Sequence, residues 1–231
     1  MVNAGSAHGC TKSSRNVIGV LLAFDTATPA VTVALHDGER VLAEVTTVDA
    51  RRHGELLAPG IAGVLAEAGI VRQDLTAIAV GVGPGPFTGL RIGLVTARTL
   101  SMVLEIPVYG VCTLDVFAAE AVDSGAVDGE FLVATDARRK EVYWASYDEH
   151  GVRLDGPNVS KPADVATDRH VVGRGALLYP ESFPSFAGIE NPRAAVLAQL
   201  VTDERVELLD ADPLYLRRPD AVAPGKPKRV S

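Results

Sequence analysis

The sequence predicts an α/β protein made of two related lobes, and three observations support this class. Apolar stretches of strand length alternate with stretches in which apolar residues recur at helical spacing. The pattern of strand, aspartate, turn and strand occurs twice, with Asp25 and Asp136 at matching places. Hydrophobic residues make up 47% of the 231 residues and aromatic residues only 5%, so a core of Ala, Val and Leu is expected.

The first lobe is expected over residues 17–123, after a leader over residues 1–16 that shows no periodicity. Its strands are expected at 18–25, 30–36, 40–48, 77–82 and 107–111. Its helices are expected at 53–68, 87–104 and 114–122, the first ending at Gly69. This order of elements is that of a ribonuclease-H-like lobe.

The second lobe is expected over residues 124–212 and repeats this order in a reduced form. Strands are predicted at 131–135, 141–147, 152–154 and 170–173, and a helix at 192–206. The segment 213–231 is rich in Pro and in basic residues and is expected to be a tail. Two facing lobes of this type form the actin, Hsp70 and sugar-kinase (ASKHA) class, here with a reduced second lobe.

The charge of the chain argues against direct binding to nucleic acid. The chain has 22 basic and 29 acidic residues, and residues 1–16 and 213–231 hold seven of the bases and one of the acids. Residues 17–212 therefore keep 15 bases and 28 acids, a net charge of −13. Because affinity for nucleic acid rests mainly on neutralising phosphates, we expect any RNA to be met only indirectly, through another subunit. Arg138-Arg139-Lys140 at a predicted hairpin tip and the basic tail are expected to be solvated, with contact to RNA as the alternative.

Membrane and disulfide signals are weak. No apolar run approaches the roughly 18–20 residues needed to span a bilayer. The two cysteines, Cys10 and Cys112, cannot form a disulfide framework. We therefore expect a cytoplasmic protein that does not enter a membrane.

The stretch from Ala77 to Leu104 is the most informative, since an apolar strand runs into Gly83-Pro84-Gly85-Pro86 and then into a helix. This arrangement can bind an anion through free backbone N–H groups. Neither standard phosphate motif is present, because the loop has no Lys and because Pro86 and Thr88 stand where a third glycine would be. The segment is therefore read first as a fold-defining turn and second as a ligand loop.

A stripe of small residues marks the helix that follows this loop. Gly89, Gly93, Ala97 and Ser101 recur at every fourth position. Such a stripe lets another helix approach closely.

Six blocks of sequence stand in order over about residues 18–220. They read FDTATPAVTVAL, RRHGELLAP, GVGPGPFTGLRIGLVTARTL, PVYGVCTLDVFA, TDARRKEVYW and PLYLR. Together they resemble the bacterial TsaB family, whose pattern does not include the 16-residue leader.

The resemblance implies a non-catalytic subunit that binds the transferase subunit TsaD, and with it the ATPase TsaE. This machinery places threonylcarbamoyl on the adenosine beside the anticodon in tRNAs that read ANN codons. The resemblance also implies a heterodimer with TsaD and a homodimer when TsaD is absent. No cofactor is expected on this subunit alone, and ATP is used by the complex.

The resemblance further implies that the metal site of TsaD is absent from this chain. TsaD holds a metal through an HxxxH pair, and the matching positions here are Thr113 and Phe117. Neither side chain can replace His as a ligand, and the five histidines nowhere show HxxxH spacing. We therefore expect no metal site and no metallopeptidase activity.

The segment Asp25-Thr26-Ala27-Thr28 matches the first phosphate loop of the ASKHA class, in which the strand-end Asp holds Mg²⁺. Without Mg²⁺, a carboxylate about 4 Å from a phosphate charge costs on the order of 4 kcal/mol at an effective dielectric near 20. A helix N-terminus returns only about 0.3–1 kcal/mol.

We therefore expect a vestigial phosphate loop in which Asp25, Thr26 and Thr28 cap a turn. Its residues are Asp25, Thr26, Thr28, Gly83, Gly85 and Asp136. The alternative function is a stand-alone ASKHA-type ATPase or small-molecule kinase that uses Asp25 and the Gly83–Gly85 loop.

In the family, the partner surface comes from the two helices that match 53–68 and 87–104 here. The residues expected on that surface are His53, Leu57, Ile61, Val64, Gly89, Gly93 and Ala97. The alternative is that the small stripe faces the protein's own sheet, because the sequence does not fix the rotation of either helix.

Overall fold

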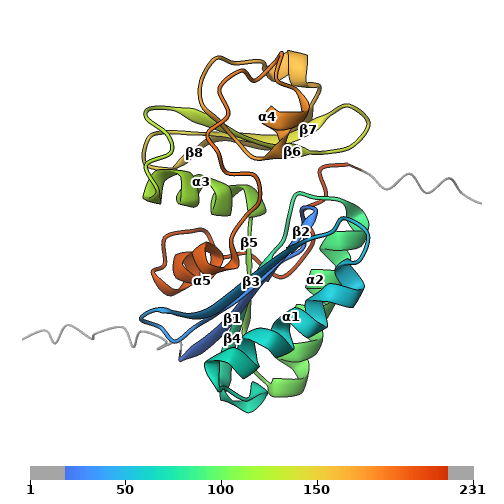
Figure 1. Cartoon of the computed structure of the whole chain (residues 1–231), viewed down its shortest axis with the longest axis vertical. Coiled ribbons are helices and arrows are strands. Elements are labelled where there is room, and N and C mark those ends of the chain that lie inside the picture. Colours follow the sequence, from blue (N-terminus) through green and yellow to red (C-terminus); the bar gives the residue numbers. More distant parts are fainter. Residues whose placement is uncertain (1–18, 218–231) are drawn as a thin grey trace, which may run out of the picture.

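The computed structural model describes residues 19–217, which form two β-sheets with helices packed on and between them (Figure 1). The expected leader over residues 1–16 and the expected tail from residue 218 onward lie outside the described residues. The elements follow one another in the order predicted from the sequence, with boundaries that differ by a few residues.

The first sheet has the strand order β3-β2-β1-β4-β5. Its strands are β1 (Val20–Asp25), β2 (Ala30–His36), β3 (Val41–Val48), β4 (Leu75–Gly81) and β5 (Val108–Val111). Strand β2 pairs antiparallel with β1 and β3, whereas β4 pairs parallel with β1 and β5. Helices α1 (His53–Ala68) and α2 (Phe87–Leu104) cover one face of this sheet, and α5 (Ala194–Thr202) covers the other (Figure 1).

Strand β1 shows why the first sheet reads as continuous apolar sequence. Leu22 and Phe24 belong to the core under α1 and α2, whereas Leu21 and Ala23 belong to the core under α5. All four side chains are fully buried. A strand that is covered on both faces has no polar side, so its residues do not alternate.

The second sheet has the strand order β8-β7-β6-β9. Its strands are β6 (Phe131–Asp136), β7 (Val142–Tyr147), β8 (Arg153–Ser160) and β9 (Val171–Val172). Strand β8 runs well past the predicted end at residue 154, because a polar edge strand that contains Gly156-Pro157 lacks the apolar alternation used to find it. The remaining short elements are η1 (Arg72–Asp74), η2 (Pro162–Val165) and α4 (Arg174–Leu178).

Helix α3 (Thr113–Asp123) lies between the two sheets. Phe117 packs with the inner side chains of the second sheet, whereas Val116 packs in the core that α5 shares with the first sheet. The predicted lobes 17–123 and 124–212 are therefore not separate in packing.

Helix α5 corrects the expected lobe boundaries, because it lies within 124–212 but packs on the first sheet. Leu197 and Val201 are buried there together with Leu21 of β1. The helix is also shorter than the predicted 192–206. Its apolar face covers the side of the larger sheet away from α1 and α2, next to Val116 and Ala119 of α3.

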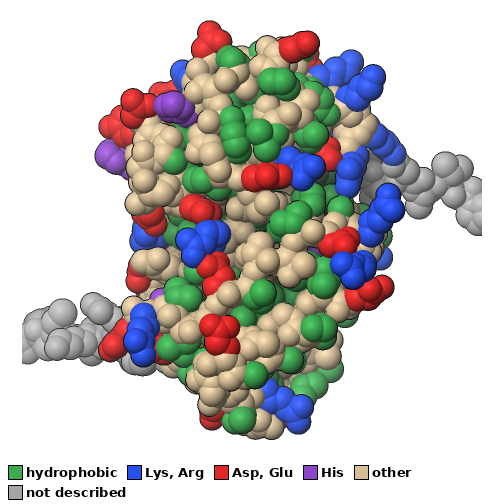
Figure 2. All heavy atoms as spheres, viewed as in Figure 1, with side chains coloured by type: hydrophobic (Ala, Val, Ile, Leu, Met, Phe, Trp, Pro, Cys, Tyr) green, Lys and Arg blue, Asp and Glu red, His purple; other side chains and the backbone are tan. Residues whose placement is uncertain are grey.

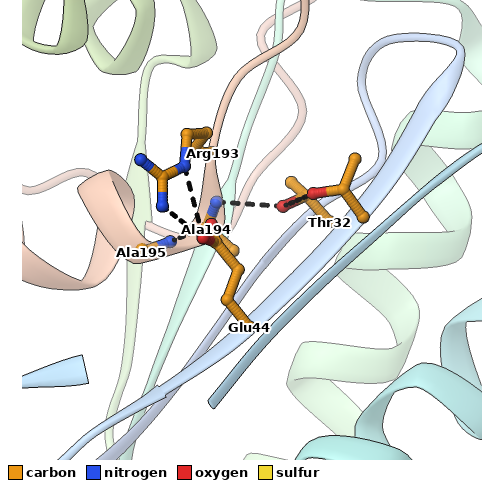
Figure 3. A network of polar contacts seen from close by, with 6 residues as sticks. Thr32, Glu44, Arg193, Ala194 and Ala195 are labelled. Atoms are coloured by element: carbon orange, nitrogen blue, oxygen red, sulfur yellow. Dashed lines mark hydrogen bonds and ion pairs between the residues drawn. The ribbon is translucent and has the colours of Figure 1, made fainter. Parts of the chain in front are cut away.

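Two side chains of the first sheet cap the N-terminus of α5 (Figure 3). Thr32 Oγ1 accepts a hydrogen bond from the Ala194 N–H at 3.0 Å, and Glu44 Oε1 accepts one from the Ala195 N–H at 3.0 Å. The second oxygen of Glu44 accepts from the Arg193 guanidinium at 2.5 Å. These contacts satisfy helix N–H groups that no residue of α5 itself caps.

The beginning of the expected tail is part of the folded structure, which corrects the predicted boundary at residue 213. The Leu214 N–H donates to Val82 O at 2.9 Å, and the Tyr215 ring stacks on Phe87 with a centroid distance of 5.5 Å. Arg217 Nη1 donates to Ala137 O at 2.8 Å, next to the β6–β7 hairpin. Residues 213–217 thus cross from the first sheet to the second.

Candidate functional site

Asp25 ends β1 and is buried, with an exposed fraction of 1%. Its Oδ1 accepts a hydrogen bond from the Ala27 N–H at 2.7 Å, and its Oδ2 accepts one from the Thr113 hydroxyl at 2.6 Å. Burial raises the pKa of the carboxyl group, and the two hydrogen bonds oppose that rise. Both oxygens are therefore engaged by the protein itself.

Thr113 ties the Asp25 turn to the Gly/Pro loop between β4 and α2. Its hydroxyl accepts from the Gly83 N–H at 3.2 Å, and its own N–H donates to Gly83 O at 2.8 Å. The sequence indicates only that Thr113 cannot bind metal. It does not predict that Thr113 joins the two loops, because its hydrogen-bond partners lie 30 and 88 positions away in the chain. Phe117, at the other HxxxH position, fills the core beneath the second sheet.

The remaining residues of the expected phosphate loop also contact the protein itself. Thr26 donates its hydroxyl to Gly89 O at 2.8 Å, and Thr28 Oγ1 accepts from the Ala30 N–H at 3.2 Å. At Gly85, a Cβ atom would lie 2.2 Å from Ala27 O, so the loop rests directly on the turn. These are the contacts of a capped turn packed against a glycine loop.

This arrangement does not fit a Mg²⁺-phosphate group at Asp25. A carboxylate that binds Mg²⁺ needs an oxygen facing an open site, whereas Asp25 is 1% exposed and each of its oxygens accepts a hydrogen bond inside the fold. At Gly81, a Cβ atom would lie 1.7 Å from Asp25 Oδ2, so the strand also closes on the carboxylate.

Asp136 occupies the matching place in the second lobe, with different surroundings. Its Oδ1 accepts from the Arg138 N–H at 2.7 Å, and its Oδ2 lies 3.2 Å from the Arg138 guanidinium. It lines a narrow hollow between the lobes together with Thr28, Pro86 and Arg174. Asp25 does not line this hollow, so the two strand-end aspartates do not share one open site.

Within residues 19–217, no three His, Cys, Asp or Glu side chains come together in a way that could hold a metal ion. His53 uses its Nε2 atom to contact Thr28 O at 2.7 Å. Burial raises the pKa of the Cys112 thiol to about 12, so this side chain is not a nucleophile at neutral pH.

The seven residues expected on the partner surface lie inside the protein. The buried residues of α1 are His53, Leu57, Ile61 and Val64, and those of α2 include Gly89, Gly93 and Ala97. A Cβ atom at Gly93 would lie 2.4 Å from Thr26 Oγ1, and one at Gly89 would lie 2.5 Å from Thr26 O. The small stripe thus makes room for the Asp25 turn and not for a partner helix. This corrects the expectation that these residues form an exposed surface.

The opposite side of the same two helices is exposed and largely apolar or small. We call this side the outer face; on α2 it contains Val95, Met102 and Val103, with exposed fractions of 62%, 75% and 67%. On α1 the exposed residues are mostly small, with two glutamates among them: Gly54, Glu55, Ala58, Pro59, Ala62, Gly63, Ala66 and Glu67. No atom lies within 4 Å of a Cβ built at Gly63, so this glycine faces open space.

Helix α2 also has the length and composition of a membrane-spanning segment. It is 18 residues long with a mean hydropathy of 1.2, but its apolar residues do not form an uninterrupted run. Its Leu, Ile, Val, Phe and Met side chains raise its mean hydropathy although Arg91 and Arg98 interrupt it. Leu90 and Leu94 pack in the core of the first sheet, and Arg98 pairs with Asp212, as expected for a helix of a folded domain.

Comparisons with known proteins agree with this architecture. A family model described as TsaD, tRNA N6-adenosine threonylcarbamoyltransferase, matches residues 40–190. An uncharacterized protein of Mycobacterium tuberculosis (strain ATCC 25618 / H37Rv) is 45% identical over 217 residues, which cover 90% of this chain and 96% of that protein. The tRNA threonylcarbamoyladenosine biosynthesis protein TsaB of Bacillus subtilis (strain 168) is 30% identical over 223 residues, covering 88% and 96%.

A solved structure extends the similarity to the fold. It is a Pseudomonas aeruginosa protein described as uncharacterized, with similarity to peptidase YEAZ, and it matches with a TM-score of 0.75 and 32% identity. The match covers 86% of this chain and 100% of that chain, so it includes both sheets. The predicted α/β class with two lobes and a reduced second lobe is confirmed.

Proposed function

Because the chain belongs to the TsaB family, we propose that it acts in the biosynthesis of threonylcarbamoyladenosine in tRNA as a non-catalytic subunit. The family assignment rests on relatives such as the Bacillus subtilis protein, which is 30% identical over almost its whole length. The closed turn at Asp25 is the observation that carries the non-catalytic role.

The Asp25 turn supports a subunit that carries out no phosphoryl transfer by itself. In an ASKHA enzyme the strand-end aspartate must reach a metal ion, but here its oxygens are held by Ala27 and Thr113. The same Thr113 hydroxyl also accepts the Gly83 N–H of the glycine loop, which leaves one fewer free N–H group there for a phosphate. Any ATP used in the pathway would then be bound by another subunit.

The partner in this proposal is a TsaD-type transferase subunit, with TsaE recruited to the resulting complex. The surface proposed to bind the TsaD-type subunit is the outer face of α1 and α2. There α2 exposes Val95, Met102 and Val103, and most of the exposed residues of the neighbouring α1 are small. Apolar side chains grouped on one face are typical of an interaction site. A second copy of this chain is the proposed occupant when the partner is absent.

The role is tested by depleting the protein from its own host cells and measuring threonylcarbamoyladenosine in purified tRNA by mass spectrometry. The expected result is loss of the modification, restored by the wild-type gene and by a gene that carries Asp136→Ala. Normal modification in depleted cells would contradict the proposal.

The non-catalytic part of the proposal is tested separately with the purified protein. We expect no Mg²⁺-dependent ATP turnover above that of a heat-denatured sample. Turnover that disappears in Asp25→Asn would instead support the alternative, a stand-alone ATPase or kinase.

A further inference from the structure

One edge of the molecule carries an excess of basic side chains, although residues 17–212 have a net charge of −13. Figure 2 shows Lys and Arg side chains gathered along the side from which the C-terminal residues leave the folded part. We call this the basic edge and define it by Arg51, Arg91, Arg138, Arg139, Lys140 and Arg217. Asp136 pairs with Arg138, and Glu141 pairs with Arg217.

The members of the basic edge come from four separate segments that the fold brings together. Arg51 and Arg138 line one surface hollow together with Thr28 and Thr88, between α2 and the β6–β7 hairpin. Arg217 reaches the same hairpin through its hydrogen bond to Ala137 O. The edge therefore spans both lobes and includes hydroxyl groups as well as cations.

The hairpin tip holds its basic side chains in a costly backbone conformation. Arg138, Arg139 and Lys140 have φ values of 60°, 55° and 60°, in the left-handed region that glycine or asparagine usually occupies. All three side chains are exposed. The tight hairpin between β6 and β7 itself favours positive φ values. Glycine would adopt them with less strain, so the presence of three basic side chains at this tip supports a role for their charge.

An exposed aromatic pair lies beside these cations. Phe87 and Tyr215 stack on each other with exposed fractions of 42% and 38%. The Arg91 guanidinium lies 3.8 Å from the centre of the Phe87 ring and also donates to the Tyr215 hydroxyl at 3.1 Å. Exposed rings next to cations are suited to stacking on unpaired nucleobases.

We propose that the basic edge binds the backbone of RNA directly and that the Phe87–Tyr215 pair stacks on an unpaired base. The proposal rests on the proposed function, in which the RNA is tRNA. Acids elsewhere on the molecule do not prevent this contact, because charges beyond about 10 Å are largely screened at 0.1 M salt. The proposal replaces the expectation, drawn from the net charge, of purely indirect contact.

The test measures binding of labelled tRNA across a series of salt concentrations, for the chain alone and for its complex with a TsaD-type subunit. The edge variant is Arg51→Gln, Arg138→Gln and Lys140→Gln, all at exposed positions. The control variant removes three exposed bases at the far ends of the two sheets, as Arg40→Gln, Arg72→Gln and Arg169→Gln. Thermal unfolding and complex formation are measured for both variants.

The edge variant is expected to bind tRNA at least about tenfold more weakly at 0.1 M salt. The slope of log K against log salt should fall by about two, since each lost phosphate contact removes about 0.7–0.9. The control variant should stay within about twofold of wild type. Tyr215→Ala should weaken binding by about tenfold without changing the slope, because stacking is not an ionic contact.

Equal affinities and slopes for the edge and control variants would overturn the proposal while leaving the proposed function intact. An edge variant that binds tRNA normally but fails to form the complex would also overturn it and assign the edge to a protein contact. A wild-type chain that forms no complex, yet loses tRNA affinity in the edge variant, would contradict the proposed function and support the RNA contact.

Discussion

The two sides of the α1–α2 layer use similar residues for different purposes. On the inner side, Gly89 and Gly93 lie so close to the Thr26 backbone and hydroxyl that no side chain fits between them. On the outer side, Gly63 faces open space and Val95 is largely exposed. Small residues at helical spacing are thus a structural requirement on one side, and they leave a flat, accessible surface on the other.

This difference shows what a small-residue stripe means in such a fold. The inner stripe lets α2 approach a turn that Asp25 and Thr113 hold rigid, so it belongs to the folding of the chain. The outer side contributes little to that core and is available to a partner. Substitutions on the two sides should therefore have separable effects on stability and on binding.

The largest effect is expected from arginine placed on the inner side. At Gly93 even a Cβ atom would lie only 2.4 Å from Thr26 Oγ1, so there is no room for the side chain of Gly93→Arg. We expect this variant to lose more than about 3 kcal/mol in unfolding free energy. Gly63→Arg, its matched control on the outer side, should change stability by less than about 0.5 kcal/mol. Urea denaturation of both variants measures this, and similar midpoints would remove the distinction between the two sides.

The next largest loss of stability is expected at the Asp25 turn, which the inner side of α2 contacts. Asp25→Ala leaves the Ala27 N–H and the Thr113 hydroxyl buried without an acceptor, which should cost about 2–3 kcal/mol. Asp136→Ala removes a partly exposed cap and an ion pair and should cost less than about 1 kcal/mol. Denaturant midpoints compare the two, and a larger loss in Asp136→Ala would show that the two turns have been assigned the wrong roles.

Thr113→Val isolates the link between the turn and the glycine loop. The substitution keeps the shape of the side chain but removes the donor to Asp25 and the acceptor for the Gly83 N–H, so we expect a loss of about 1–2 kcal/mol. Thr113→Ser keeps the hydroxyl and should lose less. If the valine and serine variants unfold at the same denaturant concentration, the hydroxyl is not what holds the two loops together.

The smallest change in stability is expected at Glu120 of α3, on the opposite face of the first sheet, where it should depend on pH. Burial raises the pKa of its carboxyl group from 4.5 to about 7, Arg193 opposes the rise, and Glu44 adds to it. Its Oε2 atom is buried without a hydrogen-bond partner. The folded protein therefore holds this proton more tightly than the unfolded chain does. The resulting stability is present below pH 4.5 and is lost as the pH rises to about 7.

Glu120→Gln should remove this pH dependence. Because the side chain is only partly buried, solvent screening reduces the expected gain at pH 8 to on the order of 1 kcal/mol, and the gain should disappear near pH 4.5. Thermal unfolding at pH 5 and pH 8 measures the difference. A variant that is equally stabilised at both pH values would show that packing, and not the carboxylate, is responsible.

The sequence predicts the strands and helices of this fold well, because periodicity and turn residues are local signals. It does not predict how far a helix is rotated about its own axis, and this decides whether Gly93 or Gly63 faces the sheet. It also misses contacts made over long separations, such as the bond from Thr113 to Asp25 and the packing of α5 on the first sheet. Most of strand β8 beyond residue 154 is missed because its residues are polar.

The most direct test of the account is a titration of a TsaD-type subunit against this protein by isothermal calorimetry. Wild type is compared with Val95→Asp and Gly63→Arg on the outer face, and with Arg169→Gln on the second lobe as a matched surface control. We expect the two outer-face variants to remain folded and to lose at least about 2 kcal/mol of binding free energy, as residues at the centre of an interface do. The control should bind like wild type. Unchanged affinity in both folded outer-face variants would contradict the central claim that this face receives the partner.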